Sequence, residues 1–205
     1  MKIQMLQVAP LGTNCYIVCD ENAKLCAVVD PGGDAARIDR AVKDGGYTPA
    51  CILLTHGHYD HTGGVAELQK LWPDVPAYLS KKDRFPAGSA ESRLFLPLEG
   101  DVRDYGEGDV ITVGELEFRV MSTPGHSEGS VTIRVGDVLL CGDTLFAGSC
   151  GRTDFTGGSM RKMMDSLKRL AQLEGDLDVL PGHMDISDLE TERMHNPYVI
   201  QALRN

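Results

Sequence analysis

Several features that define other classes of protein are missing from this sequence. No window holds the roughly 20 apolar residues that a membrane-spanning helix needs. The first ten residues lack the apolar stretch and small-residue cleavage site of a secretory signal. None of the six cysteines forms a CxxC pair, the spacing typical of redox motifs and structural zinc sites. We therefore expect a cytoplasmic protein with no membrane partner, whose cysteines are reduced and packed in the core.

Basic residues are also scarce. The 20 Lys and Arg stand against 30 Asp and Glu, which gives a formal net charge of −10, and no cluster of basic side chains offsets it locally. Such a chain repels a phosphate backbone, so nucleic acid is not an expected partner. A length of 205 residues, with 42% hydrophobic and 24% charged residues, fits one globular domain with a full hydrophobic core.

Strand-like and helix-like segments alternate in the first half of the chain. Apolar runs predict strands, and 3.6-residue spacing closed by glycines predicts a helix. The strands are expected at 15–20, 25–31 and 50–55, and the helix at 34–46. A second helix is expected after Thr62, a plausible N-cap. Residues 80–108, rich in Gly, Pro and charge, are expected to form a mobile connection.

The second half repeats the alternation. Four strands, one helix, a further strand and a last helical stretch are expected, in that order, at 109–113, 115–123, 129–136, 137–143, 159–173, 176–183 and from about Leu189. Two similar halves of this kind suggest a four-layer α/β sandwich. Period and length alone are equally compatible with a single wound sheet, so the pattern leaves both folds open.

Three of the six histidines fall in one segment, THGHYDH, directly after a predicted strand. His56 and His58 are two residues apart, so on extended chain their side chains project to the same side, as two ligands of one ion must. Asp60 and His61 follow where the chain turns toward a helix, which aims them at a second ion. A structural zinc site is the weaker interpretation, because such sites are usually closed by cysteine and this segment has none.

Further ligand-type residues follow other predicted strands. His126 lies in TPGHSEGS, Asp143 in CGDTLF and His183 in LPGHMDIS. Strand-end loops are where functional residues concentrate, and the recurrence favours one shared metal site. His195 belongs to no such loop and is expected on a helix surface.

At these residues the sequence resembles the metallo-β-lactamase superfamily, whose signature is HxHxDH followed by a His, an Asp and a final His at strand ends. The resemblance covers nearly the whole chain and implies the αββα form of the four-layer sandwich. It implies that His56, His58 and His126 hold one metal ion, that Asp60, His61 and His183 hold the other, and that Asp143 bridges them. Zinc is the expected metal, with iron or manganese as alternatives.

Within that superfamily, the run LFAGSCGRTDFTGG and the closing PGH and NPY elements are similar to glyoxalase II, a hydroxyacylglutathione hydrolase. The resemblance implies cleavage of a small-molecule thioester such as S-lactoylglutathione by a metal-bound hydroxide, with Asp60 and Asp143 as catalytic residues. Arg152 matches a basic position near the family's substrate pocket and is expected to bind a substrate carboxylate. Its other interpretation is a surface salt bridge.

The chain departs from full-length glyoxalase II in one respect. Those enzymes carry a C-terminal helical domain that contacts glutathione, whereas this sequence ends soon after His183, so we expect a single domain at 1–205 without it. Asp143 stands where true metallo-β-lactamases commonly have Cys or Ser, which disfavours antibiotic hydrolysis. Two other functions stay open: an iron-dependent persulfide dioxygenase, and a non-catalytic metal-binding scaffold of the same fold.

Overall fold

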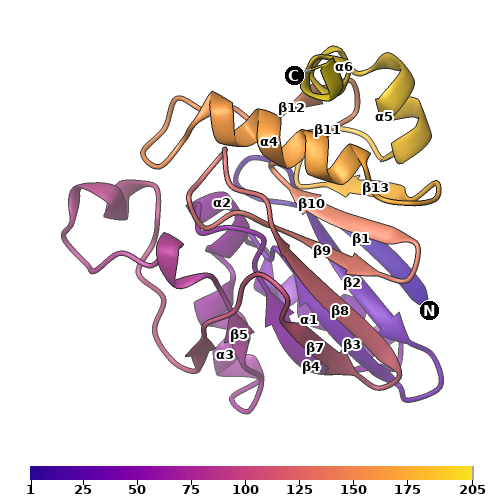
Figure 1. The fold of residues 1–205 in the computed structure, drawn as a ribbon. Helices are drawn as coiled ribbons and strands as arrows, with labels where there is room; N and C mark the ends of the chain where they lie inside the picture. The colour runs from indigo at the N-terminus through magenta and orange to yellow at the C-terminus, as the bar shows by residue number, and fades with distance from the viewer. Residues whose placement is uncertain (205) are drawn as a thin grey trace.

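The computed structural model describes residues 1–204, so that Asn205, the last residue of the expected domain 1–205, lies outside the described residues. Two six-stranded sheets face each other, and helices cover the outer face of each (Figure 1). The expected four-layer αββα sandwich is therefore confirmed, and the alternative of a single wound sheet is wrong.

The first sheet has the strand order β1-β2-β3-β4-β5-β6. Its first three strands are antiparallel and the others join in parallel. The bounds are β1 (Lys2–Val8), β2 (Thr13–Asp20), β3 (Leu25–Val29), β4 (Thr48–Leu53), β5 (Ala77–Tyr78) and β6 (Val102–Arg103). The sequence does not predict β1, because this edge strand carries a lysine and two glutamines among its apolar residues.

The helices beside this sheet are α1 (Ala35–Asp44), α2 (Tyr59–Thr62) and α3 (Val65–Leu71). Thr62 is not the N-cap of the longer helix, as the sequence predicted, because the chain first makes the short turn α2. The Thr62 hydroxyl donates to the carbonyl oxygen of His58 inside that turn, at 3.2 Å, and Gly64 precedes α3 instead.

The segment 80–108 is more structured than the expected mobile connection. It contains two 3₁₀ turns, η1 (Lys81–Asp83) and η2 (Ala90–Arg93), as well as β6. Its Asp83, Phe95 and Tyr105 side chains are buried. These buried side chains pack the segment against the rest of the protein. The expectation of a mobile connection is therefore corrected.

The second sheet has the strand order β14-β13-β10-β9-β8-β7, in which only β10 and β13 are parallel. The bounds are β7 (Val110–Val113), β8 (Leu116–Ser122), β9 (Val131–Val135), β10 (Val138–Gly142), β13 (Asp178–Pro181) and β14 (Ser187–Asp188). Above it lie a small hairpin and three helices: β11 (Leu145–Phe146), β12 (Ser149–Cys150), α4 (Met160–Ala171), α5 (Leu189–His195) and α6 (Pro197–Arg204).

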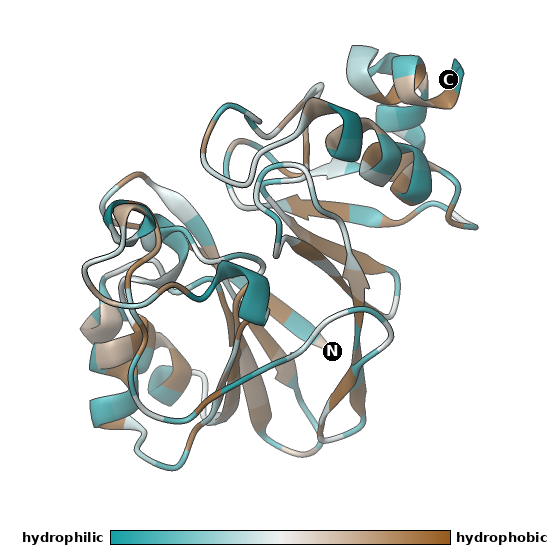
Figure 2. Ribbon diagram, turned by 60° about the vertical axis from the view of Figure 1, so that its left-hand side comes forward, coloured by the Kyte–Doolittle hydropathy of each residue, from teal (hydrophilic) through white to brown (hydrophobic). Residues whose placement is uncertain are grey.

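Three apolar clusters fill the spaces between the four layers. One joins α1 and α3 to the first sheet, a second lies between the sheets, and a third joins α4 and α6 to the second sheet. In Figure 2 the strands are largely brown, whereas the helices show teal on the sides turned away from them. All six cysteines are free and five of them are buried, in agreement with their expected role as core thiols.

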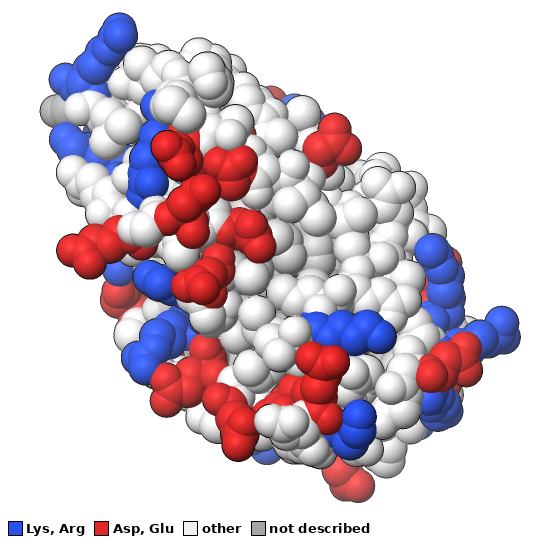
Figure 3. All heavy atoms as spheres, turned by 90° about the vertical axis from the view of Figure 1, so that its right-hand side faces the viewer, with Lys and Arg blue, Asp and Glu red and all other residues white. Residues whose placement is uncertain are grey.

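The excess of Asp and Glu over Lys and Arg is visible on the protein surface. On the face shown in Figure 3, acidic side chains gather in two groups beside a broad uncharged area, with basic side chains interspersed. Among residues 1–204, no helix has the length and apolar character needed to cross a membrane.

Candidate metal centre

Strand ends of both sheets bring the candidate ligands together. The loop after β4 and the turn α2 carry His56, His58, Asp60 and His61, while His126, Asp143 and His183 follow β8, β10 and β13. All seven side chains cluster where these strands end, although 122 positions separate His61 from His183. His195 is exposed at the end of α5, as expected.

The first three ligand atoms form a tight triangle. His56 Nε2 lies 3.0 Å from His58 Nδ1, which lies 2.8 Å from His126 Nε2. Nitrogens that bind one zinc ion tetrahedrally at 2.0–2.1 Å stand about 3.3 Å apart. The triangle therefore has the size of a three-histidine metal site, and we call it the first triad.

Asp60, His61 and His183 form a second triad. His183 Nε2 lies 3.0 Å from Asp60 Oδ2 and 3.3 Å from His61 Nε2. The two nitrogens face each other and the carboxylate, an arrangement that also suits one divalent ion. His183 is the most exposed of the three, with 23% of its side chain accessible, whereas His61 is fully buried.

Asp143 lies between the triads. Its Oδ2 is 3.5 Å from His126 Nε2 of the first triad, and its Oδ1 is 3.4 Å from His61 Nε2 of the second. Oδ1 is buried and has no hydrogen-bond partner among the described residues. A buried carboxylate oxygen without a donor is costly, and a bound cation would satisfy it. This orphaned oxygen and the donor set thus fit a pair of metal ions.

The local electrostatics favour cation binding at the first triad. Burial, aided by the neighbouring imidazoles, lowers the pKa of His58 to about 3 and that of His56 well below its ordinary value. Both rings are therefore neutral at pH 7, which is the protonation state that binds a metal. Burial opposes ionisation of Asp143, but His61 and the other imidazoles outweigh it and lower the pKa of this carboxyl.

His61 behaves differently. Burial disfavours its charged form, yet the carboxylates of Asp143 and Asp30 outweigh burial and raise its pKa well above the ordinary value. Its Nδ1–H donates to Asp30 Oδ2 at 2.9 Å, which directs Nε2 toward Asp60 and His183. Carboxylate–histidine pairs of this kind fix the orientation of metal-binding imidazoles.

The sequence prediction missed Asp30. Its carboxylate also accepts from the Thr55 amide at 2.8 Å and the Thr55 hydroxyl at 2.6 Å. The Thr55 oxygen in turn lies 3.2 Å from His56 Nδ1, so that Asp30 orients one imidazole of each triad. A signal was present, because Asp30 directly follows the apolar run of β3, as the predicted ligands follow their own strands.

The last ligand loop is held by the opposite sheet. The backbone N–H of Asn14 donates to the Gly182 carbonyl oxygen at 2.8 Å. The Tyr16 hydroxyl donates to the Pro181 carbonyl oxygen, also at 2.8 Å. The Asn14 side chain donates to the Met184 carbonyl at 2.9 Å. Strand β2 therefore fixes the backbone on either side of His183.

A cavity of about 390 Å³ opens onto the two triads. Apolar side chains and Arg152 form its outer walls, and the residues that line it are Leu11, His58, Tyr59, Asp60, Leu94, His126, Asp143, Arg152, Phe155 and His183. Arg152 is thus at the pocket, but its guanidinium already makes two hydrogen bonds of 2.7 Å to Asp154 and lies 3.8 Å from the Phe155 ring centre. Both interpretations of Arg152 keep support: it lines the pocket and forms an exposed ion pair.

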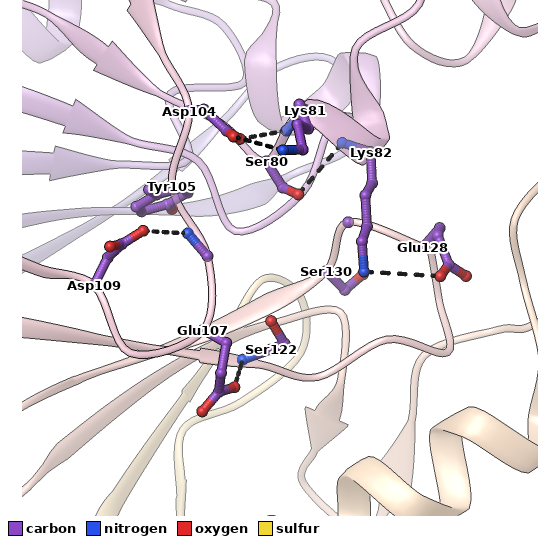
Figure 4. Close-up of a pocket in the computed structure, with 12 residues that line it drawn as sticks. Ser80, Lys81, Lys82, Asp104, Tyr105, Glu107, Asp109, Ser122, Glu128 and Ser130 are labelled. Atoms are coloured by element: carbon purple, nitrogen blue, oxygen red, sulfur yellow. Dashed lines mark hydrogen bonds and ion pairs between the residues drawn. The ribbon is translucent and has the colours of Figure 1, made fainter.

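A hollow of about 300 Å³ lies at a different place, between η1 and the turn after His126 (Figure 4). Its walls are mostly polar, and several charged side chains there are paired with one another, such as Lys81 with Asp104 and Lys82 with Glu128. It contains none of the seven candidate ligands. The cavity at the triads is therefore the better candidate for an active site.

Comparison with known proteins agrees with this geometry. A protein of Aquifex aeolicus (strain VF5) is 38% identical, with 99% of each chain covered. The probable metallo-hydrolase YqgX of Bacillus subtilis (strain 168) is 33% identical over 97% of this chain and 98% of its own. A hydroxyacylglutathione hydrolase of Xanthomonas euvesicatoria pv. vesicatoria (strain 85-10) is 38% identical over 76% of this chain, which spans 55% of that enzyme.

Solved structures show the same fold. BLEG-1, named a B3 metallo-β-lactamase, has a TM-score of 0.87 at 32% identity, with 97% of this chain and 99% of its own covered. TTHA1623, solved in a di-iron-bound form, has a TM-score of 0.83 at 32% identity, covering 95% and 99%. ETHE1 from Myxococcus xanthus has a TM-score of 0.79 at 27% identity, covering 100% and 91%.

The family model of the metallo-β-lactamase superfamily matches residues 8–183, a span that begins in β1 and ends at the last candidate ligand. With that match and the relatives above, the chain belongs to the metallo-β-lactamase superfamily.

Proposed function

We propose that this chain is a metal-dependent hydrolase that cleaves small-molecule thioesters. One observation carries the proposal: two triads of largely buried His and Asp side chains meet at Asp143, on the floor of a single cavity. The first triad, His56, His58 and His126, holds one divalent ion, and Asp60, His61 and His183 hold the other. Zinc is the expected metal. Bound ions of this kind lower the pKa of water toward about 7 and polarise a carbonyl oxygen.

The protein's own residues supply orientation and charge. Asp143 contacts both triads and links them. Asp60 contributes a second carboxylate. Burial opposes its ionisation, but the neighbouring imidazoles outweigh burial and lower its pKa, so that it stays ionised. Leu11, Leu94 and Phe155 give the cavity apolar walls for the organic part of a substrate. A thiolate leaves without needing a proton, which suits a cavity whose floor is built from metal-ligand side chains.

Among the reactions of the superfamily, we propose thioester cleavage for this chain for two reasons. The hydroxyacylglutathione hydrolase relative is 38% identical over its matched part. Asp143 also supplies a carboxylate, not a thiolate or hydroxyl, between the triads. Because the chain spans little more than half of that relative, S-lactoylglutathione is one candidate substrate within the class.

The decisive experiment combines elemental analysis of the purified protein with a substrate panel. We expect two divalent ions per chain, and cleavage of S-lactoylglutathione or a simpler thioester in oxygen-free buffer. A single iron with oxygen consumption on glutathione persulfide would identify a dioxygenase instead. The panel should include a β-lactam, because BLEG-1 is named a β-lactamase. Faster cleavage of the β-lactam than of any thioester would also contradict the proposal. A protein that binds metal but turns over no substrate of the panel would indicate a scaffold.

Arg152 provides a test of substrate charge. Its Nη1 is not used in the pairing with Asp154, so we propose that this edge binds a substrate carboxylate. Arg152→Leu should raise KM for an anionic thioester several-fold, the scale expected when a solvent-exposed charged contact is lost. The KM of an uncharged thioester should stay the same.

Arg161→Leu is the matched control, because Arg161 is exposed beside a different surface depression. If Arg152→Leu changes neither KM, Arg152 forms only a surface salt bridge with Asp154.

A further inference from the structure

A buried aspartate outside the proposed ligand set connects two of the ligand loops. Asp83, in η1, is 2% exposed and accepts three hydrogen bonds. Its Oδ2 accepts from the Gly57 amide at 2.9 Å and from the Ser127 hydroxyl at 2.6 Å. Its Oδ1 accepts from the Gly129 amide at 2.7 Å. Gly57 lies between His56 and His58, and Ser127 directly follows His126.

The two glycines at this contact leave room for the carboxylate. A Cβ atom on Gly57 would stand 2.7 Å from the Asp83 carbonyl oxygen, and one on Gly129 would stand 2.6 Å from Asp83 Cγ. Contacts this short do not occur in proteins, so any side chain at either position would push Asp83 away. The close approach of η1 to both ligand loops therefore depends on these residues together.

A second contact joins η1 to the turn after His126 on the outside. Lys82 Nζ lies 3.9 Å from the Glu128 carboxylate across the hollow shown in Figure 4. About half of each side chain is exposed, so this ion pair is worth little. The buried carboxylate is thus the main link between these segments.

We propose that Asp83 is a positioning residue for the first triad, which sets the distance between the loop of His56 and His58 and the loop of His126. The inference rests on the proposed metal site. One carboxylate spans both loops, and all of its hydrogen bonds within residues 1–204 go to Gly57, Ser127 and Gly129. None of these residues belongs to the second triad. Asp83 should therefore tune one of the two ion sites and not the other.

The test is Asp83→Asn, which keeps the size of the side chain. In either orientation of the amide, its NH₂ group faces an N–H donor, that of Gly57 or that of Gly129. Titration of the metal-free protein with Co²⁺ against a chromophoric chelator should show one binding step weakened about 10- to 100-fold, the usual cost of losing an outer contact of a metal site. The other step should be unchanged.

Two ligand variants identify the weakened step. The Co²⁺ absorption band that His126→Ala removes should be the one weakened in Asp83→Asn, whereas the band that His183→Ala removes should persist. Ser127→Ala, which deletes one of the three donors, should weaken the same step several-fold, and it keeps the test decisive if Asp83→Asn does not fold.

Two controls separate positioning from general stability. Asp20 is also buried and accepts from three backbone amides, those of Asn22, Ala23 and Glu115, far from the triads at the β2–β3 turn. Asp20→Asn should lower the melting temperature and leave both binding steps intact. Lys82→Ala, which breaks the outer ion pair, should leave them intact as well.

Equal binding of both ions by Asp83→Asn and wild type would overturn the positioning role alone. Equal weakening of both steps, or the same loss in Asp20→Asn, would overturn it too. A wild-type protein that binds fewer than two ions would contradict the proposed function, and with it this inference.

Discussion

Replacing Asp143 with alanine should lower turnover about a thousandfold or more, the cost of removing a major source of electrostatic stabilisation. Its carboxylate reaches His126 of the first triad and His61 of the second, and its Oδ1 has no other partner among the described residues. Without it, two cations would lie close together with only Asp60 to offset their repulsion. Elemental analysis should therefore find fewer than two ions per chain, and steady-state kinetics should show the loss in kcat.

Asp137 is the matched control for this substitution. It lies exposed just before β10, whereas Asp143 directly follows the same strand. Asp137→Ala should keep both the metal content and kcat. Wild-type kinetics and metal content in Asp143→Ala would show that the carboxylate does not join the two ions.

Removing the metal should have the second-largest effect, on stability. An ion present at about a thousand times its Kd adds about 4 kcal/mol to the stability of the folded state. For a chain of this size each kcal/mol corresponds to about 2–4 °C in Tm, so each filled triad should raise Tm on the order of 10 °C. Calorimetry of the protein with excess chelator, and again after zinc is restored, measures the difference.

The remaining histidine provides the control for metal binding. His195 is exposed on α5, away from both triads, so His195→Ala should gain the same Tm increase with zinc as the wild type. His61→Ala should lose most of the increase that belongs to the second triad. Equal melting temperatures with and without metal in the wild type would contradict the metal centre.

The main elements of the fold could be predicted from sequence, but their arrangement could not. The runs that form β2, β3, β4, β8, β9 and β10 are apolar or alternating, and such patterns report burial directly. Periodicity does not say whether two halves share one sheet or face each other, because both arrangements bury the same faces. The resemblance to a family, carried by His and Asp residues at strand ends, supplied that information.

The clustering of the seven candidate ligands could be predicted from the sequence, whereas the residues that we propose to act through other side chains could not. The seven proposed ligands stand out because His and Asp directly follow apolar strands. Asp83 gave no such signal, since it lies in a segment rich in Gly, Pro and charge that looks like a loop. Its proposed role comes from contacts with Gly57 and Ser127, which are distant in sequence and become visible only when the loops are packed.

The hydrogen bonds from Asn14 and Tyr16 to the loop of His183 have a consequence for the newly synthesised chain. All three residues of the first triad are available once residue 126 has left the ribosome, whereas the second triad must wait for residue 183. In the folded chain that late loop is held by the pairing of β13 with β10 and by the hydrogen bonds from β2 to the neighbouring carbonyls. Metal taken up during translation would therefore enter a half-built centre at its three-histidine end, and the second ion would follow after the two sheets have docked.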